Sequence, residues 1–401
     1  MTKKLNNLLH QNPPIGGQGG FLVNAHLHTP FSFSAFNDID DALDRAVAEN
    51  VKVVGINDFY TAEGYAEWAE GCKKRNLYPL FNIELISLDK DFQQAGVRVN
   101  DPANPGRTYI SGKGLSYPFR LAEPHASQLA NVQNEANKQV EAMCRKLNEL
   151  LAAKNIGFSL DFNRIKKDLT RGNVRERHLA KALRLKVYEK CNNDEACIQK
   201  LLKDIFGGKE LKSSAENVAG VENEIRSNLL KAGGAAFVPE TEEAFLSVEA
   251  VCKIILEAGG IPTYPFLADD ANWNYTDFEG DLEGVANELT KRGFHSVEFI
   301  TTRNDVKLLE EYATYLHEQG FVVTFGSEHN SPMMEPIELF ARNKTPLSEK
   351  LLQINYEGAC VIAAHQHLVA KGLTGYVDKE GNADRARREE FVRLGDELIA
   401  P

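Results

Sequence analysis

Residues 21–28 read FLVNAHLH, an apolar run that ends in two histidines separated by one leucine. Side chains alternate between the two faces of an extended strand, so His26 and His28 are expected to point the same way. Imidazole is a suitable ligand for zinc, manganese or iron. A His-x-His pair is a weak motif when it stands alone. The stretch therefore predicts a strand that ends in half of a metal site, and the rest of the chain must supply the other half.

Outward from this stretch, apolar extended runs alternate with amphipathic helical runs. Strands are expected at 21–25, 51–57, 78–87, 260–264, 295–300 and 321–325, and helices at 38–48, 61–75, 242–257, 282–292 and 306–318. Alternation of this kind predicts a parallel sheet or barrel with helices outside it. The predicted fold class is therefore α/β.

Two segments depart from this rhythm. Residues 128–231 are rich in Lys, Glu, Asn, Leu and Ala at helical spacing, which predicts a helical insertion or cap. The barrel is then discontinuous, with residues 1–127 and 232–401 on either side of the insertion. Residues 89–118 contain several prolines and glycines and are expected to form a long loop.

Composition narrows the classes of partner. The chain has 401 residues, of which 43% are hydrophobic and 26% charged, with a formal net charge of −11. A negative balance argues against general affinity for nucleic acid or anionic membrane. No apolar run approaches the length of a membrane span, and residues 1–18 lack the apolar middle of a secretory signal, so we expect a cytoplasmic protein. Six scattered cysteines are expected to be reduced thiols.

Acidic residues fall at the ends of the expected strands, where barrel enzymes gather their reactive groups. Asp58 ends the second strand, Glu84 the third and Glu328 the last. Glu84 lies in an apolar run, and burying a carboxylate costs several kcal/mol unless it is paired or bound to metal. Glu84 thus indicates a bound cation. The alternatives are an exposed edge residue at Glu84 and a loop or helix-capping carboxylate at Glu328.

Taken together, these stretches resemble the PHP family, the polymerase and histidinol phosphatase group of metal-dependent phosphoesterases. The matching segments are 24–32 (NAHLHTPFS), 54–59 (VGINDF), 81–84 (FNIE), 325–330 (FGSEHN), 259–265 and 296–299. The resemblance implies a distorted TIM-like (β/α)7 barrel that binds up to three metals, commonly zinc, manganese or iron, for phosphate ester hydrolysis. It also implies a first metal site made of His26, His28, Glu84 and Glu328.

A further match lies in the helical insertion. Residues 177–183 (RHLAKAL) resemble a Thr-His-Phe-Ala-Arg-His-Leu stretch of the nucleotide-phosphatase-like branch, in which the histidine reaches the metal centre from a cap. The resemblance implies that His178 is a ligand, with Lys181 on the same helix face and Glu84 bridging to a second ion. The alternative is a basic helix that faces solvent.

Other positions depart from the family pattern. Phe33, Phe59 and Asn330 stand where ligands of the third metal are expected, and Tyr264 replaces a histidine of the second site. We therefore expect one or two divalent ions (zinc, manganese or iron) rather than three. A register shift of one residue would make His329 a ligand instead of Asn330.

The predicted function is a PHP-like metal-dependent hydrolase, a phosphoesterase that acts on a small phosphorylated substrate. Asp58, Tyr264 and Arg303 are the candidate catalytic residues: Tyr264 to donate a hydrogen bond to phosphate and Arg303 to neutralise its charge. A core-packed tyrosine and a solvated arginine are the alternatives. A competing hypothesis is a catalytically degenerate PHP-fold protein with a binding or structural role.

Overall fold

The sheet of this protein runs in sequence order and nearly closes on itself. The computed structural model describes residues 20–269 and 274–400; the N-terminal stretch considered above for a secretory signal lies outside them. The strands are β1 (Leu22–Leu27), β2 (Val51–Phe59), β3 (Tyr78–Leu88), β4 (Arg107–Lys113), β5 (Ile261–Phe266), β6 (Ser296–Ile300) and β7 (Val322–Gly326). Beyond β7, the Glu328 amide donates to the His26 carbonyl at 3.0 Å, and the His28 amide donates to the Glu328 carbonyl at 2.7 Å. These bonds join the two edges, which confirms the predicted α/β barrel.

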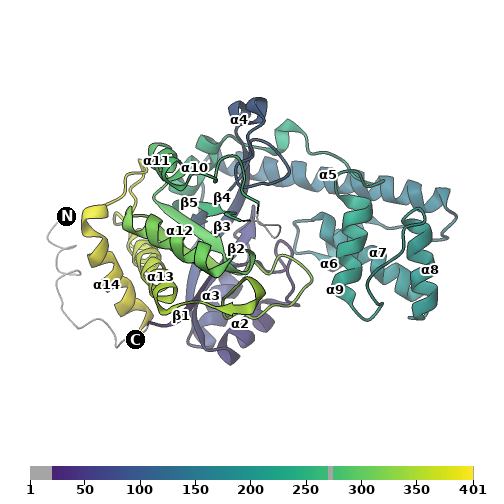
Figure 1. The fold of residues 1–401 in the computed structure, drawn as a ribbon, viewed down its shortest axis with the longest axis horizontal. Coiled ribbons are helices and arrows are strands. Elements are labelled where there is room, and N and C mark those ends of the chain that lie inside the picture. Colours follow the sequence, from purple (N-terminus) through teal and green to yellow (C-terminus); the bar gives the residue numbers. More distant parts are fainter. Residues whose placement is uncertain (1–19, 270–273, 401) are drawn as a thin grey trace.

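Helices cover the outside of the sheet, as Figure 1 shows. They are α2 (Ile39–Ala48), α3 (Tyr65–Lys74), α10 (Val248–Glu257), α11 (Leu282–Lys291), α12 (Val306–Glu318), α13 (Glu349–Ala370) and α14 (Arg388–Ile399), with a short α4 (Lys90–Ala95) beyond β3. Helix α2 begins where the sequence predicts, because the Asp38 carboxylate accepts a hydrogen bond from the Asp41 amide at 2.8 Å. Single 3-10 turns lie at Glu242–Ala244, Thr301–Arg303, Arg342–Lys344 and Arg385–Arg387, and a small hairpin pairs β8 (Phe340–Ala341) with β9 (Thr345–Pro346).

The segment expected to be a long loop contains a strand of the barrel. β4 pairs antiparallel with both β3 and β5, so the sheet is not purely parallel. Its sequence, RTYISGK, carries Ser111 and Lys113 at buried positions, and these polar residues weaken the apolar pattern by which strands are recognised. The prediction of a long loop over 89–118 was therefore wrong for the part that forms α4 and β4.

The helical insertion lies to one side of the barrel (Figure 1). It contains α5 (His125–Ala153), α6 (Phe162–Leu169), α7 (Glu176–Lys190), α8 (Glu195–Ile205) and α9 (Val218–Ile225), followed by a π-helical turn at Arg226–Leu230. These helices pack around an apolar cluster of their own, to which Leu147, Leu183 and Ile198 belong. The barrel has a separate cluster between its strands and outer helices.

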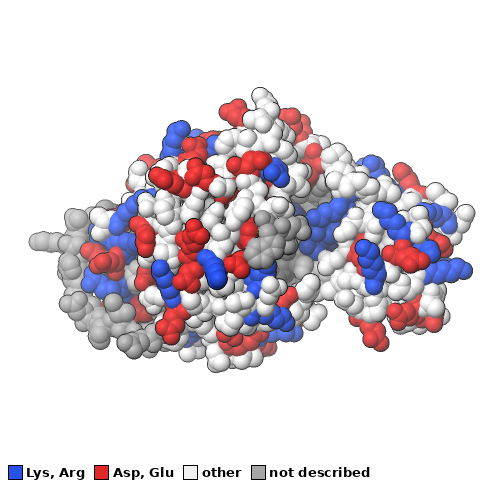
Figure 2. Space-filling model, in the orientation of Figure 1, with Lys and Arg blue, Asp and Glu red and all other residues white. Residues whose placement is uncertain are grey.

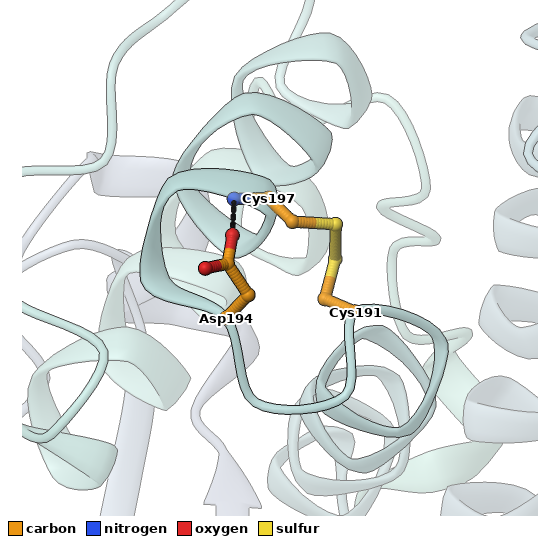
Figure 3. The surroundings of a disulfide bond; sticks show 3 residues. All are labelled: Cys191, Asp194 and Cys197. Atoms are coloured by element: carbon orange, nitrogen blue, oxygen red, sulfur yellow. Dashed lines mark hydrogen bonds between the residues drawn. A yellow bond between two sulfur atoms is a disulfide. The ribbon is translucent and has the colours of Figure 1, made fainter.

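One pair of cysteines departs from the expected reduced state. Cys191 and Cys197 form a disulfide between α7 and α8, with their Cα atoms 5.5 Å apart (Figure 3). Asn192 and Asn193 adopt left-handed backbone conformations, with φ of 48° and 60°, and turn the chain tightly enough to bring the two thiols together. Sequence spacing alone does not reveal such a turn. Cys72, Cys144, Cys252 and Cys360 are free thiols.

Within the described part of the chain, we find no helix that combines the length and the apolar character needed to cross a lipid bilayer. A second His-x-His pair, His365 and His367, lies on the Ala-rich helix α13. There the His365 ring hydrogen-bonds the Gly259 carbonyl at 2.8 Å, so this histidine joins α13 to the barrel.

Candidate metal centre

Three ligand-type side chains converge inside the barrel. His26 lies at the end of β1, His28 follows directly after it, and Glu84 lies on β3. The Nε2 atoms of the two imidazoles are 3.2 Å apart, and Glu84 Oε2 lies 3.2 Å from His28 Nε2 and 3.8 Å from His26 Nε2. All three side chains are buried. Two nitrogens and one carboxylate oxygen thus surround a common point, as expected of half or more of a tetrahedral zinc-type site.

The carboxylate of Glu84 supplies the strongest local evidence for a cation. Its Oε2 atom is buried and has no hydrogen-bond partner among the described residues. Leaving a buried oxygen unsatisfied costs roughly 1–3 kcal/mol, and more for a charged group. Burial raises the pKa of Glu84, and burial together with the charge of His26 lowers the pKa of His28. A neutral imidazole is the form that binds metal, and a cation would satisfy the carboxylate, so these residues fit a divalent ion.

Each imidazole is also held from behind. His26 Nδ1 lies 3.0 Å from Glu298 Oε2, and His28 Nδ1 lies 3.1 Å from the Ser32 hydroxyl. Partners of this kind fix the orientation of metal-binding histidines. Glu298 lies on β6, within an apolar strand. Like Glu84, Glu298 is a carboxylate within an apolar strand, a pattern in the sequence that indicates the site, but Glu298 is not among the predicted site residues.

Asp58, a candidate catalytic residue, lies behind His28. Its carboxylate accepts hydrogen bonds from the Thr29 amide at 2.7 Å and from the Ser32 hydroxyl at 2.5 Å. Burial raises the pKa of Asp58 to about 6, although these donors act in the opposite direction. The geometry therefore makes Asp58 an anchor for the loop that carries His28 rather than a group at the cavity surface.

Glu328, the expected fourth ligand, lies beside the cluster but is paired with an arginine. Its Oε2 atom is 2.5 Å from Arg303 Nη2. Burial alone would raise the pKa of Glu328, but the charges of Arg303, His26 and His28 together outweigh it and the pKa is lowered. Both residues line the same cavity, which brings the candidate phosphate-binding arginine to the metal centre.

The remaining histidines expected as ligands lie outside the three-atom cluster. His329 contacts the Ser327 hydroxyl through Nδ1 at 2.8 Å and the Glu335 carbonyl through Nε2 at 2.8 Å, and its ring stacks on Phe36. Both ring nitrogens are therefore engaged elsewhere. The register shift that would make His329 a ligand does not occur, because the backbone turns at Glu328 and His329, where φ is positive.

His178 reaches the edge of the site but not the cluster. Its Nδ1 accepts a hydrogen bond from the Arg175 amide at 2.9 Å, which caps the start of α7, and its ring packs edge-on against Phe33. Burial lowers the pKa of His178 to about 3. The structure thus places Phe33 against the imidazole that was expected to bind metal.

The surroundings of Tyr264 differ from those expected of a residue that binds phosphate. Its hydroxyl donates to Glu279 at 2.7 Å, and its ring packs among Phe266, Phe278 and Phe294. The side chain belongs to the buried cluster between the sheet and its outer helices, so it is the core-packed tyrosine of the alternative interpretation. The hydroxyl already donates its hydrogen bond to Glu279. The geometry therefore does not support Tyr264 as a hydrogen-bond donor to phosphate.

Aromatic rings occupy two positions at which the family pattern has ligands. Phe59 stacks on His28 with ring centroids 4.8 Å apart, and Phe33 packs on His178 as described. Neither ring can bind a metal ion. The surroundings of His28 on this side are therefore apolar.

A cavity of about 620 Å³ lies over the cluster, between the barrel and the helical insertion. Glu84 and Glu328 face it from the barrel, and residues of α5 form part of the opposite wall. Its basic residues are Arg107, Arg175, Arg177, Arg226, Lys231 and Arg303. Blue side chains gather at the hollow between the two parts in Figure 2. The acidic residues of the cavity are Glu84, Asp101, Glu176, Glu240 and Glu328, and Arg107, Arg226 and Arg303 form ion pairs with three of them. Arg175, Arg177 and Lys231 supply the remaining positive charge, which suits an anionic ligand.

Two of these arginines are partly buried. The Arg175 guanidinium lies over the Phe59 ring, 4.5 Å from its centroid. Burial and the neighbouring Arg226 lower the pKa of Arg177 to about 10, so this side chain is still charged at neutral pH. Arg175 directly precedes α7 and Arg177 lies in its first turn. The insertion therefore supplies positive charge above the barrel.

Comparison with known proteins places the fold. No protein-family model matches the sequence, and no curated protein does. A Bifidobacterium adolescentis protein designated a metal-dependent phosphoesterase aligns with a TM-score of 0.53 and 17% identity, over 86% of this chain and 96% of its own. An amidohydrolase from Chromobacterium violaceum, solved with sulfate and without metal, aligns with a TM-score of 0.52 and 16% identity, over 83% and 96%. The chain therefore shares its fold with these hydrolases.

Proposed function

We propose that this protein is a PHP-type metal-dependent hydrolase that cleaves a phosphate ester of a small substrate. The observation that carries the proposal is the Glu84 Oε2 atom, which is buried against the Nε2 atoms of His26 and His28 and has no hydrogen-bond partner in the described part of the chain. These three side chains would hold a divalent ion of zinc, manganese or iron, and Glu328 is the fourth candidate ligand. The two proteins of similar fold, one designated a phosphoesterase and one an amidohydrolase, support hydrolysis as the type of reaction.

The bound ion would supply an acidified water molecule and a polarised phosphoryl oxygen. The protein's own side chains account for the rest. Arg303 and Arg175 present guanidinium groups to the cavity, where they can bind phosphate oxygens in pairs. Asp58 and Ser32 keep the His28 ring in place from behind. The insertion covers the cavity and restricts access of bulk water to it, which strengthens these charge interactions.

A second candidate function is a non-catalytic anion-binding protein on the same fold. It is favoured by Phe33 and Phe59, which remove two potential ligands, and by the Arg303–Glu328 ion pair, which occupies the fourth ligand. In that case the cavity would bind a phosphorylated molecule without cleaving it.

The test compares the metal-loaded protein with two variants. Glu84→Gln keeps the size of the side chain but removes its charge, whereas Glu249→Gln makes the same change at an exposed position of α10. We expect the wild type and Glu249→Gln to hold stoichiometric metal and hydrolyse aryl phosphates with Mn²⁺. Glu84→Gln should lose metal and about 100-fold or more of the rate. Metal-loaded wild type that binds phosphate but hydrolyses none of a panel of phosphate esters would favour the second candidate.

A further inference from the structure

Lys113 is a fully buried lysine inside the barrel. It ends β4, and its side chain is 0% exposed. Lysine is almost never buried completely unless its charge is paired. Neither the catalytic proposal nor the family resemblance assigns this residue a role.

The ammonium group of Lys113 is surrounded by oxygen atoms. Nζ lies 2.6 Å from Glu298 Oε2, 3.2 Å from the Ala25 carbonyl and 3.4 Å from Asn57 Oδ1. Three acceptors match the three N–H donors of an ammonium group. A carboxylate, an amide oxygen and a backbone carbonyl are also the ligands that manganese and other hard divalent ions prefer. Lys113 thus occupies an oxygen-lined position that suits a cation.

This position is connected directly to the metal centre. The same oxygen of Glu298 that contacts Lys113 also contacts His26 Nδ1, at 3.0 Å. The other oxygen of Glu298 accepts a hydrogen bond from the Ser111 hydroxyl. Burial alone would raise the pKa of Glu298, but Lys113 and His26 outweigh it and keep this carboxylate ionised.

The three glutamates around the cluster differ in what they can still bind. Glu298 is paired with Lys113 and Glu328 with Arg303. Glu84 has no lysine or arginine partner among the described residues within ion-pair distance, and its Oε2 is unsatisfied. The protein thus supplies positive charge to two carboxylates and leaves one for a metal ion.

We propose that Lys113 is a built-in cation that stands in for a second metal ion: it occupies the oxygen-lined position at Glu298 and limits the centre to one divalent ion. Lys113 acts through Glu298 on His26 and is a positioning residue. The inference rests on the metal site of the proposed function but does not depend on the reaction catalysed.

The first measurement is metal stoichiometry in the full-length protein. Metal-free wild type and Lys113→Ala are titrated with Mn²⁺ by calorimetry, and bound manganese is counted by mass spectrometry after gel filtration. Alanine removes the charge and leaves room beside Glu298, so we expect one ion in the wild type and two in Lys113→Ala. Circular dichroism checks that both proteins are folded. Two ions in the wild type, or one ion of unchanged affinity in folded Lys113→Ala, would overturn the proposal.

A charge-rescue cycle decides the question if Lys113→Ala does not fold. Glu298→Gln leaves the ammonium beside His26 without its counter-charge, and we expect Mn²⁺ to bind about 100-fold more weakly. Adding Lys113→Ala to Glu298→Gln removes that excess charge and should restore about 10-fold of the affinity. A purely structural lysine predicts no restoration, and that result would overturn the proposal. Wild type that binds no ion at all would instead overturn the proposed function, and this inference with it.

Discussion

The hydrogen-bond partners of the ring nitrogens distinguish a candidate metal-binding histidine from a structural one in this protein. His28 and His329 both follow barrel strands and both were candidates from sequence. The Nε2 of His28 is directed at His26 and Glu84, whereas both nitrogens of His329 hydrogen-bond to Ser327 and Glu335. Both are histidines close to the end of a barrel strand. Whether each histidine can bind metal depends on its neighbours in the fold: Glu84 for His28, and the Ser327 hydroxyl and Glu335 carbonyl for His329. A sequence pattern does not contain this information.

Substitution at the two histidines should therefore have opposite consequences. His28→Ala is expected to lose the metal while the fold is retained, because it removes a ligand from the cluster. His329→Ala is expected to retain the metal but to lower the free energy of unfolding by about 1–3 kcal/mol, because two buried hydrogen bonds disappear. Metal analysis and chemical denaturation of both variants check this. Metal loss in His329→Ala with intact metal binding in His28→Ala would contradict the assignment.

Glu279 carries a pH dependence that can be isolated. Burial raises the pKa of Glu279 from 4.5 to about 8, against the hydrogen bond from Tyr264. Between these values the folded protein holds a proton that the unfolded chain has released, so stability falls as pH rises through this window, by an amount on the order of a few kcal/mol.

The check on Glu279 is a comparison of slopes. Glu279→Gln cannot titrate, and we expect the free energy of unfolding of this variant to fall less between pH 5 and 8 than that of the wild type. The variant should also be about 1 kcal/mol less stable at low pH, since an amide nitrogen replaces one acceptor oxygen. Denaturant titrations at several pH values give both curves, and parallel curves would contradict the raised pKa.

At the scale of elements, periodicity predicts most of the barrel. The strands next to His26, Asp58, Glu84 and Glu328 carry continuous apolar runs and were found within a few residues of their bounds. β4 was missed because its inward side chains are polar, and Lys113 was missed with it. The two neighbours of β4, both antiparallel, are set by tertiary pairing, which local sequence does not encode.

The closure of β1 against β7 depends on one small residue. Gly326 ends β7, and a methyl group added there would overlap the Cβ of His26. Gly326→Ala should therefore push His26 out of place, lower stability by about 1–3 kcal/mol and weaken metal binding. Gly280→Ala is the matched control, because its nearest neighbour would be the Thr276 carbonyl oxygen at 3.7 Å. Equal metal affinity in the two variants would argue against this close approach.

At the scale of the whole molecule, the charge that lines the cavity differs from the net charge of the chain, and the barrel and the insertion have separate apolar clusters. The net charge of −11 argues against general affinity for nucleic acid or anionic membrane, yet six basic side chains line the cavity beside five acidic ones, because folding brings arginines of the insertion over the barrel. Overall composition cannot reveal this local gathering of positive charge. The separate apolar cluster of helices α5 to α9 supports the proposal that residues 128–231 form a helical insertion or cap, although Leu129 and Val132 of α5 pack with the barrel cluster.

Leu183→Ala tests that division. Leu183 is fully buried in the cluster of the helical insertion, and its truncation should cost about 2–5 kcal/mol there. We expect faster amide hydrogen exchange within residues 128–231 and little change in the barrel strands, with metal binding retained. Uniform acceleration across both parts would mean that they unfold as one unit.

The most direct test of the metal centre is a crystal structure of the manganese-loaded protein with anomalous diffraction measured at the metal edge. The account predicts one strong peak in contact with the Nε2 atoms of His26 and His28 and the carboxylate of Glu84, at about 2.0–2.3 Å from each. A loaded protein whose peak lies elsewhere, or which shows none at these three side chains, would contradict it.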